Sequence, residues 1–318
     1  MEWRALLVLL WFLSPNHQGP YHVSSRFKEQ VAAPILMSRE HFYNRTLALH
    51  LVEYASAVYV DNPAALLTWS CSRCSGLTKG FKLSELIVDA NFNLQAFVGV
   101  AENLAALVIA FRGTQETSLQ NWMEDLYFRE YSFNYPGVKD ALVHHGFYSA
   151  YHNTTLRPRV LAAVTSVLDK RNDLRILITG HSLGGAMASL CALDLAVNFG
   201  TKDVQLITFG QPRIGNAAFA AYFNAFVPET IRVTHGHDIV PHLPPYFSLL
   251  GPRSYHHFAR EVWLTELNFG ILRLEFEFIC DSSGEDPLCS RSVYGDSISD
   301  HMEYYGVHLG FVLESTYR

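Results

Sequence analysis

The 318-residue sequence predicts an α/β fold, with a mostly parallel central sheet and helices on both of its faces. Short apolar runs alternate with helical stretches through the second half of the chain, which is typical of parallel strands joined by crossover helices. Within residues 174–197, an apolar strand also passes through a glycine-flanked turn directly into an Ala- and Leu-rich helix. We expect a single domain over residues 25–318.

The first expected elements are a helix, a hairpin and a buried strand. Arg45–Val60 has apolar residues at helical spacing and ends at an Asp-Asn-Pro stop. Leu86–Asp89 and Gln95–Val100 flank an Asn-rich turn, as two paired strands do. Leu104–Phe111 is continuously apolar, which is typical of a strand buried on both faces.

The segment after Phe111 contains two candidate functional features. Thr114 follows the strand at the sheet edge where ligands bind, so it is a candidate oxyanion donor; the alternative is a plain strand-end turn. Thr117–Tyr127 then predicts an amphipathic helix, and two interpretations are open. It is a core-packing helix, or a lid that presents its apolar stripe to lipid; the stripe consists of Leu119, Trp122, Met123 and Leu126.

The remaining elements continue the alternation. They are a helix over Ser149–Lys170 that is kinked or restarted at Pro158, a strand at Val204–Phe209, a helix at Ala217–Phe226 and a strand at Thr230–Thr234.

Gly180-His181-Ser182-Leu183-Gly184 is a G-x-S-x-G motif at the strand-to-helix turn. Such a turn strains its central residue, and glycines two positions away relieve the clashes and leave the serine hydroxyl exposed. The free N–H groups at the start of the following helix favour an oxyanion there. We predict Ser182 as a nucleophile; the alternative is a structural turn that happens to carry serine.

A serine nucleophile needs a base and an acid that orients the base. Asp238 directly follows a strand and lies between apolar residues, so it is the candidate acid, while Asp194 and Asp203 are expected to be structural. By position in the chain His301 is the first candidate base, because a late loop returns over the pocket. His257 is the second.

The N-terminus predicts export. The apolar run Ala5–Leu13 follows Arg4 and is too short to span a bilayer, so residues 1–24 are interpreted as a signal peptide and short N-terminal segment. The alternative is an uncleaved membrane anchor. Asn44 and Asn153 begin glycosylation sequons, which agrees with the secretory pathway and an extracellular location.

The five cysteines also agree with export. Cys191 lies in an apolar helix and is expected to be a buried free thiol. The other four allow two disulfides in three connectivities, of which we favour the local pairs Cys71–Cys74 and Cys280–Cys289. A four-cysteine zinc site is the less favoured alternative because the second spacing is too long, and a redox pair is less favoured still. The net charge of −6, without a basic stripe, argues against nucleic acid.

Several motifs occur together in one order. They are Phe111-Arg112-Gly113-Thr114, Asn121-Trp122 with Asp125-Leu126, Val143 to Phe147, Gly180 to Gly185, Phe209 to Asn216, Arg232-Val233 with Asp238 to Pro241, and Asp300-His301. In these motifs the chain resembles the class 3 (fungal-type) lipases, most closely their secreted plant members.

The resemblance implies an α/β-hydrolase fold with a Ser182–His301–Asp238 triad and an oxyanion hole made by the N–H groups of Thr114 and Leu183. It also implies a lid around Thr117–Asp125. The lid and substrate-lining candidates are Leu119, Trp122, Met123, Leu126 and His145.

The function expected from the resemblance is hydrolysis of lipid esters at a lipid–water interface, with peripheral contact to a membrane or lipid droplet. It needs no metal and no organic cofactor. A feruloyl or other cell-wall esterase is the alternative, and a non-catalytic scaffold is a weaker one, since no triad residue is missing. The sequence predicts neither the acyl chain length nor the oligomeric state.

Overall fold

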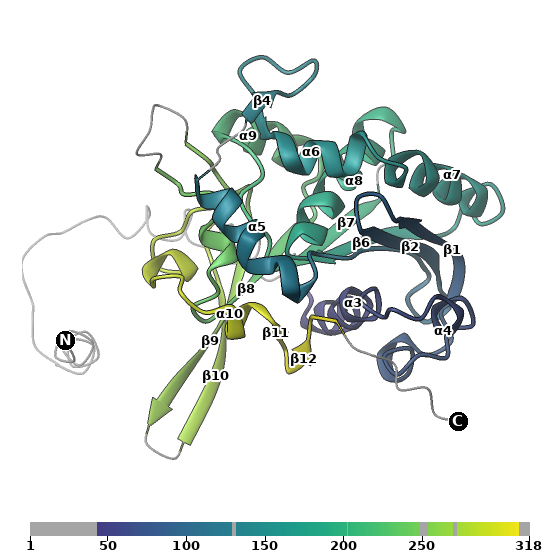
Figure 1. Ribbon diagram of the computed structural model, residues 1–318, viewed down its shortest axis with the longest axis horizontal. Helices are drawn as coiled ribbons and strands as arrows, with labels where there is room; N and C mark the ends of the chain where they lie inside the picture. The colour runs from purple at the N-terminus through teal and green to yellow at the C-terminus, as the bar shows by residue number, and fades with distance from the viewer. Residues whose placement is uncertain (1–42, 129–131, 202, 248–253, 270–271, 312–318) are drawn as a thin grey trace, which may run out of the picture. The chain divides into compact units, whose positions relative to one another are not determined.

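The computed structural model describes residues 43–128, 132–201, 203–247, 254–269 and 272–311 (Figure 1). Chain contacts group Asn44–Arg318 into one unit. The expected signal peptide lies outside the described residues. Among the helices of the described residues, none combines the length and the apolar character that crossing a membrane requires.

An eight-stranded sheet forms the centre of this unit, in the order β1-β2-β3-β6-β7-β8-β9-β10. From β3 to β9 all neighbours pair in parallel, whereas β1, β2 and β10 pair antiparallel at the two edges. The predicted mostly parallel sheet is therefore confirmed. The strands are β1 (Lys82–Asp89), β2 (Leu94–Ala101), β3 (Ala106–Phe111), β6 (Arg175–His181), β7 (Val204–Phe209), β8 (Thr230–His235), β9 (Glu261–Phe269) and β10 (Leu272–Ile279).

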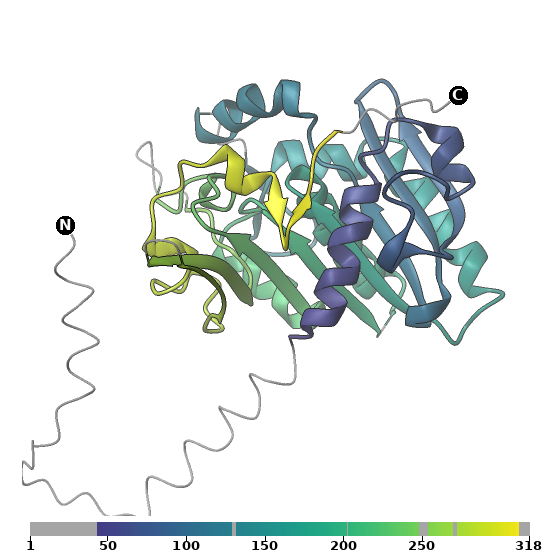
Figure 2. The same ribbon diagram turned by 90° about the horizontal axis from the view of Figure 1, so that it is seen from below.

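Helices cover both faces of the sheet (Figures 1 and 2). Helix α3 packs on one face, against β6, β3 and β7, while α7 and α8 pack on the other, and α6 lies on α8. The helices are α3 (Arg45–Ala57), α4 (Pro63–Leu67), α5 (Glu116–Phe128), α6 (His145–His152), α7 (Leu156–Leu168), α8 (Leu183–Asn198), α9 (Ala217–Phe226) and α10 (Ile298–His301). Two small sheets pair β4 (Ser132–Asn134) with β5 (Leu142–His144), and β11 (Glu303–Tyr304) with β12 (Val307–His308).

The core is built from the apolar runs that the sequence shows. Every residue of β3 is buried, and so is every residue of α8 from Gly184 to Leu195. A helix with no polar face is stable only when neighbours surround it, and α8 lies between the sheet and α6. Cys191 is a buried free thiol, and burial raises its pKa to about 12.

The helix expected over Ser149–Lys170, kinked or restarted at Pro158, is divided at a different point. The structure has two helices, α6 and α7, and the chain breaks at residues 153–155 rather than at Pro158. Pro158 is the third residue of α7, where the backbone N–H would have no partner within the helix anyway. The proline is thus compatible with the first turn of a new helix.

Both favoured cysteine pairs form disulfides, Cys71–Cys74 and Cys280–Cys289. The second pair closes a polar loop after β10. Asp286 lies beside these two sulfurs, but because the sulfurs are bonded to each other, they are not free as thiolate ligands for zinc.

Candidate active site

Ser182 stands at the turn between β6 and α8 in a strained backbone conformation, with φ 59° and ψ −129°. The flanking glycines are required by space. A Cβ on Gly180 would lie 2.3 Å from the carbonyl oxygen of Gly184, and one on Gly184 would lie 2.2 Å from that of Phe111. The turn therefore packs against both α8 and the end of β3, and it holds Ser182 at the N-terminus of α8.

Asp238 and His301 meet at the carboxyl end of the sheet. The Nδ1 atom of His301 lies 2.9 Å from Oδ2 of Asp238, and both side chains are almost completely buried. Asp238 follows β8, and its Oδ1 accepts a hydrogen bond from the N–H of Val240 at 2.8 Å. The hydroxyl of Tyr304 donates to the same Oδ2. These donors orient the carboxylate toward the imidazole.

Backbone contacts join the loops that carry the acid and the base. Asp238 forms a parallel bridge with Ser297, and Ile239 donates to the Ser297 carbonyl at 3.3 Å. The carboxylate of Asp300 accepts from the N–H of His237 at 2.7 Å. Residues some 60 positions apart are thus fixed on either side of the His301–Asp238 bond.

Ser182 and His301 each retain one polar atom without a hydrogen bond. Because Nδ1 of His301 is held by Asp238, the other ring nitrogen, Nε2, is free to act. Within the described part of the chain, Nε2 of His301 and Oγ of Ser182 are both buried and have no hydrogen-bond partner. Ser182 itself is 1% exposed, so substrate cannot reach it without a movement of the protein.

The competing sequence candidates have other partners. His257 is buried, and its Nε2 donates to the carbonyl of Pro241 at 2.8 Å, not to Asp238. Asp194 is paired with Arg157 and accepts from the Tyr151 hydroxyl, so it is structural, as expected.

Thr114 lies at the same sheet edge as Ser182. Strands β3 and β6 are parallel neighbours with Phe111 opposite Gly180, so the segments that follow both strands emerge side by side. The N–H of Leu183 opens helix α8 beside Ser182. Oγ1 of Thr114 is buried and has no hydrogen-bond partner among the described residues. Thr114 and Leu183, the residues expected to form an oxyanion hole, thus both follow strands that end at this edge of the sheet.

A buried chain of hydrogen bonds beneath the site was not predicted. The N–H of Gly113 donates to the Tyr59 hydroxyl oxygen at 3.1 Å, which lies 2.8 Å from Nδ1 of His181. Nε2 of His181 lies 2.8 Å from the carbonyl of His301. Since a carbonyl only accepts, Nε2 carries the proton. Burial, and then the charge of His301, lower the pKa of His181 well below its usual value, so the neutral ring accepts from Tyr59.

The sequence analysis therefore did not predict two tyrosines near the site, Tyr304 and Tyr59. Tyr304 lies in β11, just after the helix that ends at His301, and its contact with Asp238, 66 positions away, leaves no local signal in the sequence. Tyr59 touches residues more than 50 positions away and has no local signal.

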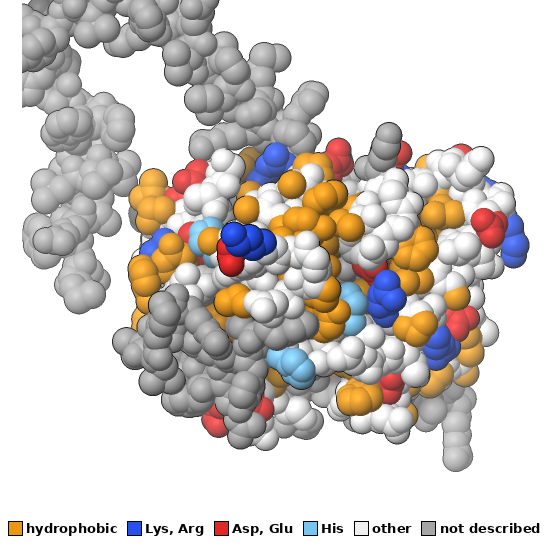
Figure 3. All heavy atoms as spheres, turned by 90° about the horizontal axis from the view of Figure 1, so that it is seen from above, with side chains coloured by type: hydrophobic (Ala, Val, Ile, Leu, Met, Phe, Trp, Pro, Cys, Tyr) orange, Lys and Arg blue, Asp and Glu red, His pale blue; other side chains and the backbone are white. Residues whose placement is uncertain are grey.

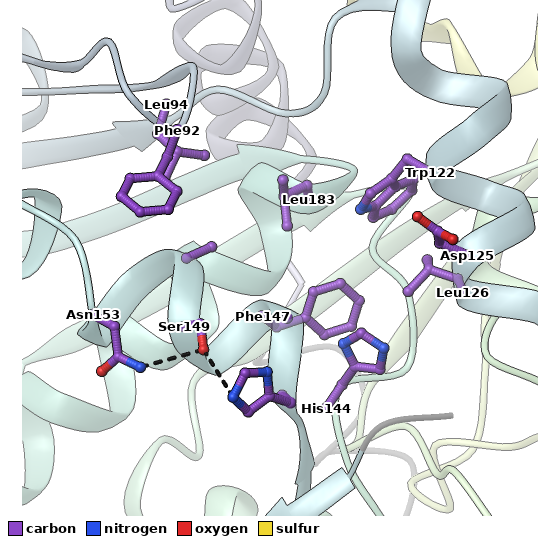
Figure 4. Close-up of a pocket in the computed structure, with 13 residues that line it drawn as sticks. Phe92, Leu94, Trp122, Asp125, Leu126, His144, Phe147, Ser149, Asn153 and Leu183 are labelled. Carbon is purple, nitrogen blue, oxygen red and sulfur yellow. Dashed lines mark hydrogen bonds between the residues drawn. The ribbon is translucent and has the colours of Figure 1, made fainter. Parts of the chain in front are cut away.

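A pocket of about 460 Å³ opens beside Leu183 (Figure 4). Its walls come from the β1–β2 turn, α5 and α6, and they are mainly apolar; the lining residues are Phe92, Leu94, Trp122, Asp125, Leu126, His144, His145, Gly146, Phe147, Ser149, Ala150, Asn153 and Leu183. Of the predicted lid and lining residues, Trp122, Leu126 and His145 line this pocket. Leu119 and Met123 point into the core instead, where both are buried.

Known proteins are similar to this chain in sequence. The sequence profile of the family described as Lipase (class 3) matches residues 108–248. The "Secreted mono- and diacylglycerol lipase A" of Penicillium cyclopium is 30% identical over 228 residues, which cover 68% of this chain and 69% of that protein. The chain belongs to the class 3 lipase family.

Solved class 3 lipase structures agree with this assignment. The native Rhizomucor miehei lipase propeptide complex superimposes with a TM-score of 0.71 at 29% identity, over 86% of this chain and 84% of that one. A structure described as a triacylglycerol lipase with a serine protease triad gives a TM-score of 0.70 at 30% identity, over 84% and 97%. The chain thus has the α/β-hydrolase fold of these lipases.

Some curated relatives are considerably longer than the matched region. The Rhizomucor miehei lipase is 34% identical over 251 residues, which cover 76% of this chain but 63% of that protein. For the Rhizopus niveus lipase, at 30% identity, the shares are 77% and 59%. The chain therefore spans about three fifths of the length of these relatives.

Proposed function

We propose that this chain is a serine hydrolase of lipid esters, with Ser182 as nucleophile, His301 as base and Asp238 as the acid that orients it. The observation that carries the proposal is the buried His301–Asp238 bond at the sheet edge where the strained Ser182 turn emerges. Membership of the class 3 lipases supports a lipid ester, such as an acylglycerol or a related polar lipid, as the substrate.

The mechanism follows from the two polar atoms that lack a hydrogen-bond partner among the described residues, Nε2 of His301 and Oγ of Ser182. Nε2 of His301 takes the proton of Ser182 Oγ, which attacks the ester carbonyl carbon. The N–H groups of Thr114 and Leu183 donate to the resulting oxyanion. When the C–O bond breaks, His301 returns the proton to the leaving alcohol. His301 then deprotonates a water, which attacks the acyl-enzyme and releases the fatty acid and free Ser182. Each step uses protein groups and water.

Helix α5 is proposed as the lid. Its inner face, with Trp122 and Leu126, lines the pocket beside Leu183, and the ring of Trp122 lies 6.3 Å from that of Phe147. Because Ser182 is buried, the described conformation is closed to substrate. Displacement of α5 would expose Ser182 and an apolar surface together, which suits a lipid–water interface.

The surface around α6 fits contact with lipid. Figure 3 looks onto the molecule from above the view of Figure 1 and shows apolar side chains gathered in the middle of this face, with histidines among them. Phe92, on the rim of the pocket, is 61% exposed. An apolar surface of this kind supports peripheral attachment to a membrane or lipid droplet.

The proposal includes export. Residues 1–24 would act as the signal peptide and residues 25–318 as the secreted domain, as the word "secreted" in the name of the Penicillium relative and the two disulfides both suggest. A closer kinship with the secreted plant members of the family is part of this proposal, and it depends on the sequence motifs alone.

The test is a panel of four substrates: a soluble short-chain ester, emulsified triacylglycerol, phospholipid and a feruloyl ester. Hydrolysis of the lipid that rises sharply when an interface forms, and that falls by several orders of magnitude in Ser182→Ala, is the expected result. Preference for the feruloyl ester without an interface effect would instead indicate a cell-wall esterase. Absence of hydrolysis on all four would overturn the proposal.

A further inference from the structure

One side of α6 forms a wall of the pocket, and the C-terminal end of this helix lies at the outer end of the wall. Gly146, Ser149, Ala150 and Asn153 all line the pocket, and their spacing of three and four places them on one side of the helix. Asn153 is the C-cap residue of α6. The row from Gly146 to Asn153 is roughly 10 Å long, at a rise of about 1.5 Å per residue. Figure 4 shows Asn153 at the opposite end of the pocket from Trp122, with Leu183 between them.

Asn153 also begins the sequon Asn153-Thr154-Thr155 and is exposed. Its Nδ2 atom lies 3.3 Å from Oγ of Ser149, another pocket residue. Figure 4 shows this amide nitrogen directed toward Ser149. Nδ2 is the atom that carries the sugar in an N-glycosylated asparagine, so a glycan here would start at the pocket wall.

We infer that Asn153 is an N-glycosylation site whose glycan limits the length of acyl chain that the pocket accepts. The inference rests on the proposed function and adds a determinant of chain length to it. Without a glycan, the pocket end is bordered by the small Asn153 side chain and by Phe92, which is 61% exposed, so a long chain can continue outward. A bulky polar sugar on Nδ2 would fill this exit.

A glycan would change selectivity because it would prevent some methylene groups of a long acyl chain from being buried in the pocket. Each methylene group that is kept out of an apolar pocket lowers binding about fourfold. Exclusion of two such groups reduces the relative rate on a long chain by roughly fifteenfold. Short acyl groups, which end before Asn153, are affected less.

The second sequon provides a matched control. Asn44 lies at the start of α3, which packs on the opposite face of the sheet from α7 and α8. Its side chain caps α3 by accepting from the N–H of Leu47. Thr46→Ala removes this sequon and leaves the cap in place, so a glycan can be removed there without any change near the pocket.

The experiment compares the wild type, Asn153→Gln and Thr46→Ala, each secreted from a glycosylating host and each also made without N-glycosylation. Mass spectrometry of glycopeptides measures occupancy at Asn153, and kcat/KM is measured for butanoyl and hexadecanoyl esters. From the glycosylating host, Asn153→Gln is expected to raise the hexadecanoyl-to-butanoyl ratio by about fifteenfold, whereas Thr46→Ala leaves it unchanged. Without glycosylation, the wild type and Asn153→Gln are expected to have equal ratios.

Three results would overturn the inference alone: an unoccupied Asn153, equal ratios in the glycosylated samples, or the same shift in the unglycosylated samples, which would assign the effect to the side chain. If no preparation hydrolysed either ester, the proposed function would fall, and this inference with it.

Discussion

At the scale of single residues, the Asp238 carboxylate is the group of the proposed triad that three hydrogen bonds hold in place. It accepts hydrogen bonds from the N–H of Val240, from the Tyr304 hydroxyl and from Nδ1 of His301. Burial, and then the nearby Asp238 charge, raise the pKa of Tyr304 well above its usual value, so its hydroxyl stays protonated and donates. The carboxylate thereby selects the tautomer of His301 whose Nε2 can accept a proton.

Tyr59 is expected to position the site without touching substrate. Tyr59→Phe removes the acceptor of Gly113 N–H and the donor to His181. An unpaired buried polar group costs about 1–3 kcal/mol, so we predict that kcat falls roughly 5- to 160-fold, with KM little changed. Steady-state kinetics on a soluble ester measures this effect.

Tyr54→Phe is the matched control for this prediction. The Tyr54 hydroxyl is buried and has no hydrogen-bond partner among the described residues, so its removal breaks no such bond. Equal kcat values for Tyr59→Phe and Tyr54→Phe would show that the chain of hydrogen bonds through His181 does not support the site.

The sequence predicts residues of the site where the signal is local. Ser182 is found by its flanking glycines, and Asp238 by its place after a strand. From position in the sequence alone, both His301 and His257 are candidate bases, because the fold determines which loop returns to Asp238. Tyr59 could not be predicted, since its partners are brought to it only when α3 packs on the sheet.

At the scale of elements, α5 forms one wall of the pocket. Its buried side packs Leu119, Met123 and Leu126 into the core, while Trp122 is half-buried on the pocket wall. Core packing and a lid, the two interpretations of this helix from the sequence, are thus compatible, because one apolar face serves both while the helix is closed.

Removal of the Trp122 ring should separate lipid from soluble substrates. Trp122→Ala deletes a wall of the pocket and the packing against Phe147. We predict at least a tenfold fall in rate on emulsified triacylglycerol, because less apolar surface is buried against the acyl chain, and a smaller fall on a short soluble ester. Ser118→Ala, on the exposed side of α5, is the control. An equal fall on both substrates would argue against a lid role for this ring.

The order of strands and helices was predictable because each buried strand is a continuous apolar run bounded by turn residues. The start of β9 at Glu261 is also expected from the sequence, whereas β10 and the position of the α6–α7 break are not. Strand β10 alternates apolar and charged residues at the sheet edge, so it lacks the apolar run of a central strand. The α6–α7 break has no glycine or proline at residues 153–155 to mark it.

At the scale of the whole molecule, a buried ionic cluster fixes the half of the sheet that carries Asp238. Arg213 pairs with Glu285 at 2.7 Å, and both side chains are 5% exposed. The same guanidinium donates to the carbonyls of His242 and Pro244, just after the loop of Asp238. Glu285 belongs to the loop closed by the Cys280–Cys289 disulfide. The disulfide therefore helps to hold Glu285 against Arg213 and supports the site through this ion pair.

Stability is predicted to fall in mild acid. Burial, followed by the charges of Arg232 and Arg213, lowers the pKa of His257 well below its usual value. The unfolded chain therefore binds a proton below about pH 6.5 that the folded chain does not. The contribution is complete above that pH and is lost as the pH falls, by about 2 kcal/mol between pH 7 and pH 5.

Denaturant unfolding at these two pH values measures the slope. In His257→Gln, whose amide can still donate to the Pro241 carbonyl, the loss of unfolding free energy between pH 7 and pH 5 should be smaller than in the wild type. An unchanged loss would show that His257 is not a source of the acid sensitivity.

The central claim is that Ser182 is the nucleophile of a lipid-ester hydrolase, and covalent labelling tests it most directly. The protein is incubated with a long-chain alkylphosphonate ester at a lipid–water interface, and the labelled peptide is identified by mass spectrometry. We predict one phosphonate on Ser182, with loss of ester hydrolysis in proportion to labelling, and none in Ser182→Ala. A label on another residue, or hydrolysis that survives complete labelling of Ser182, would contradict the account.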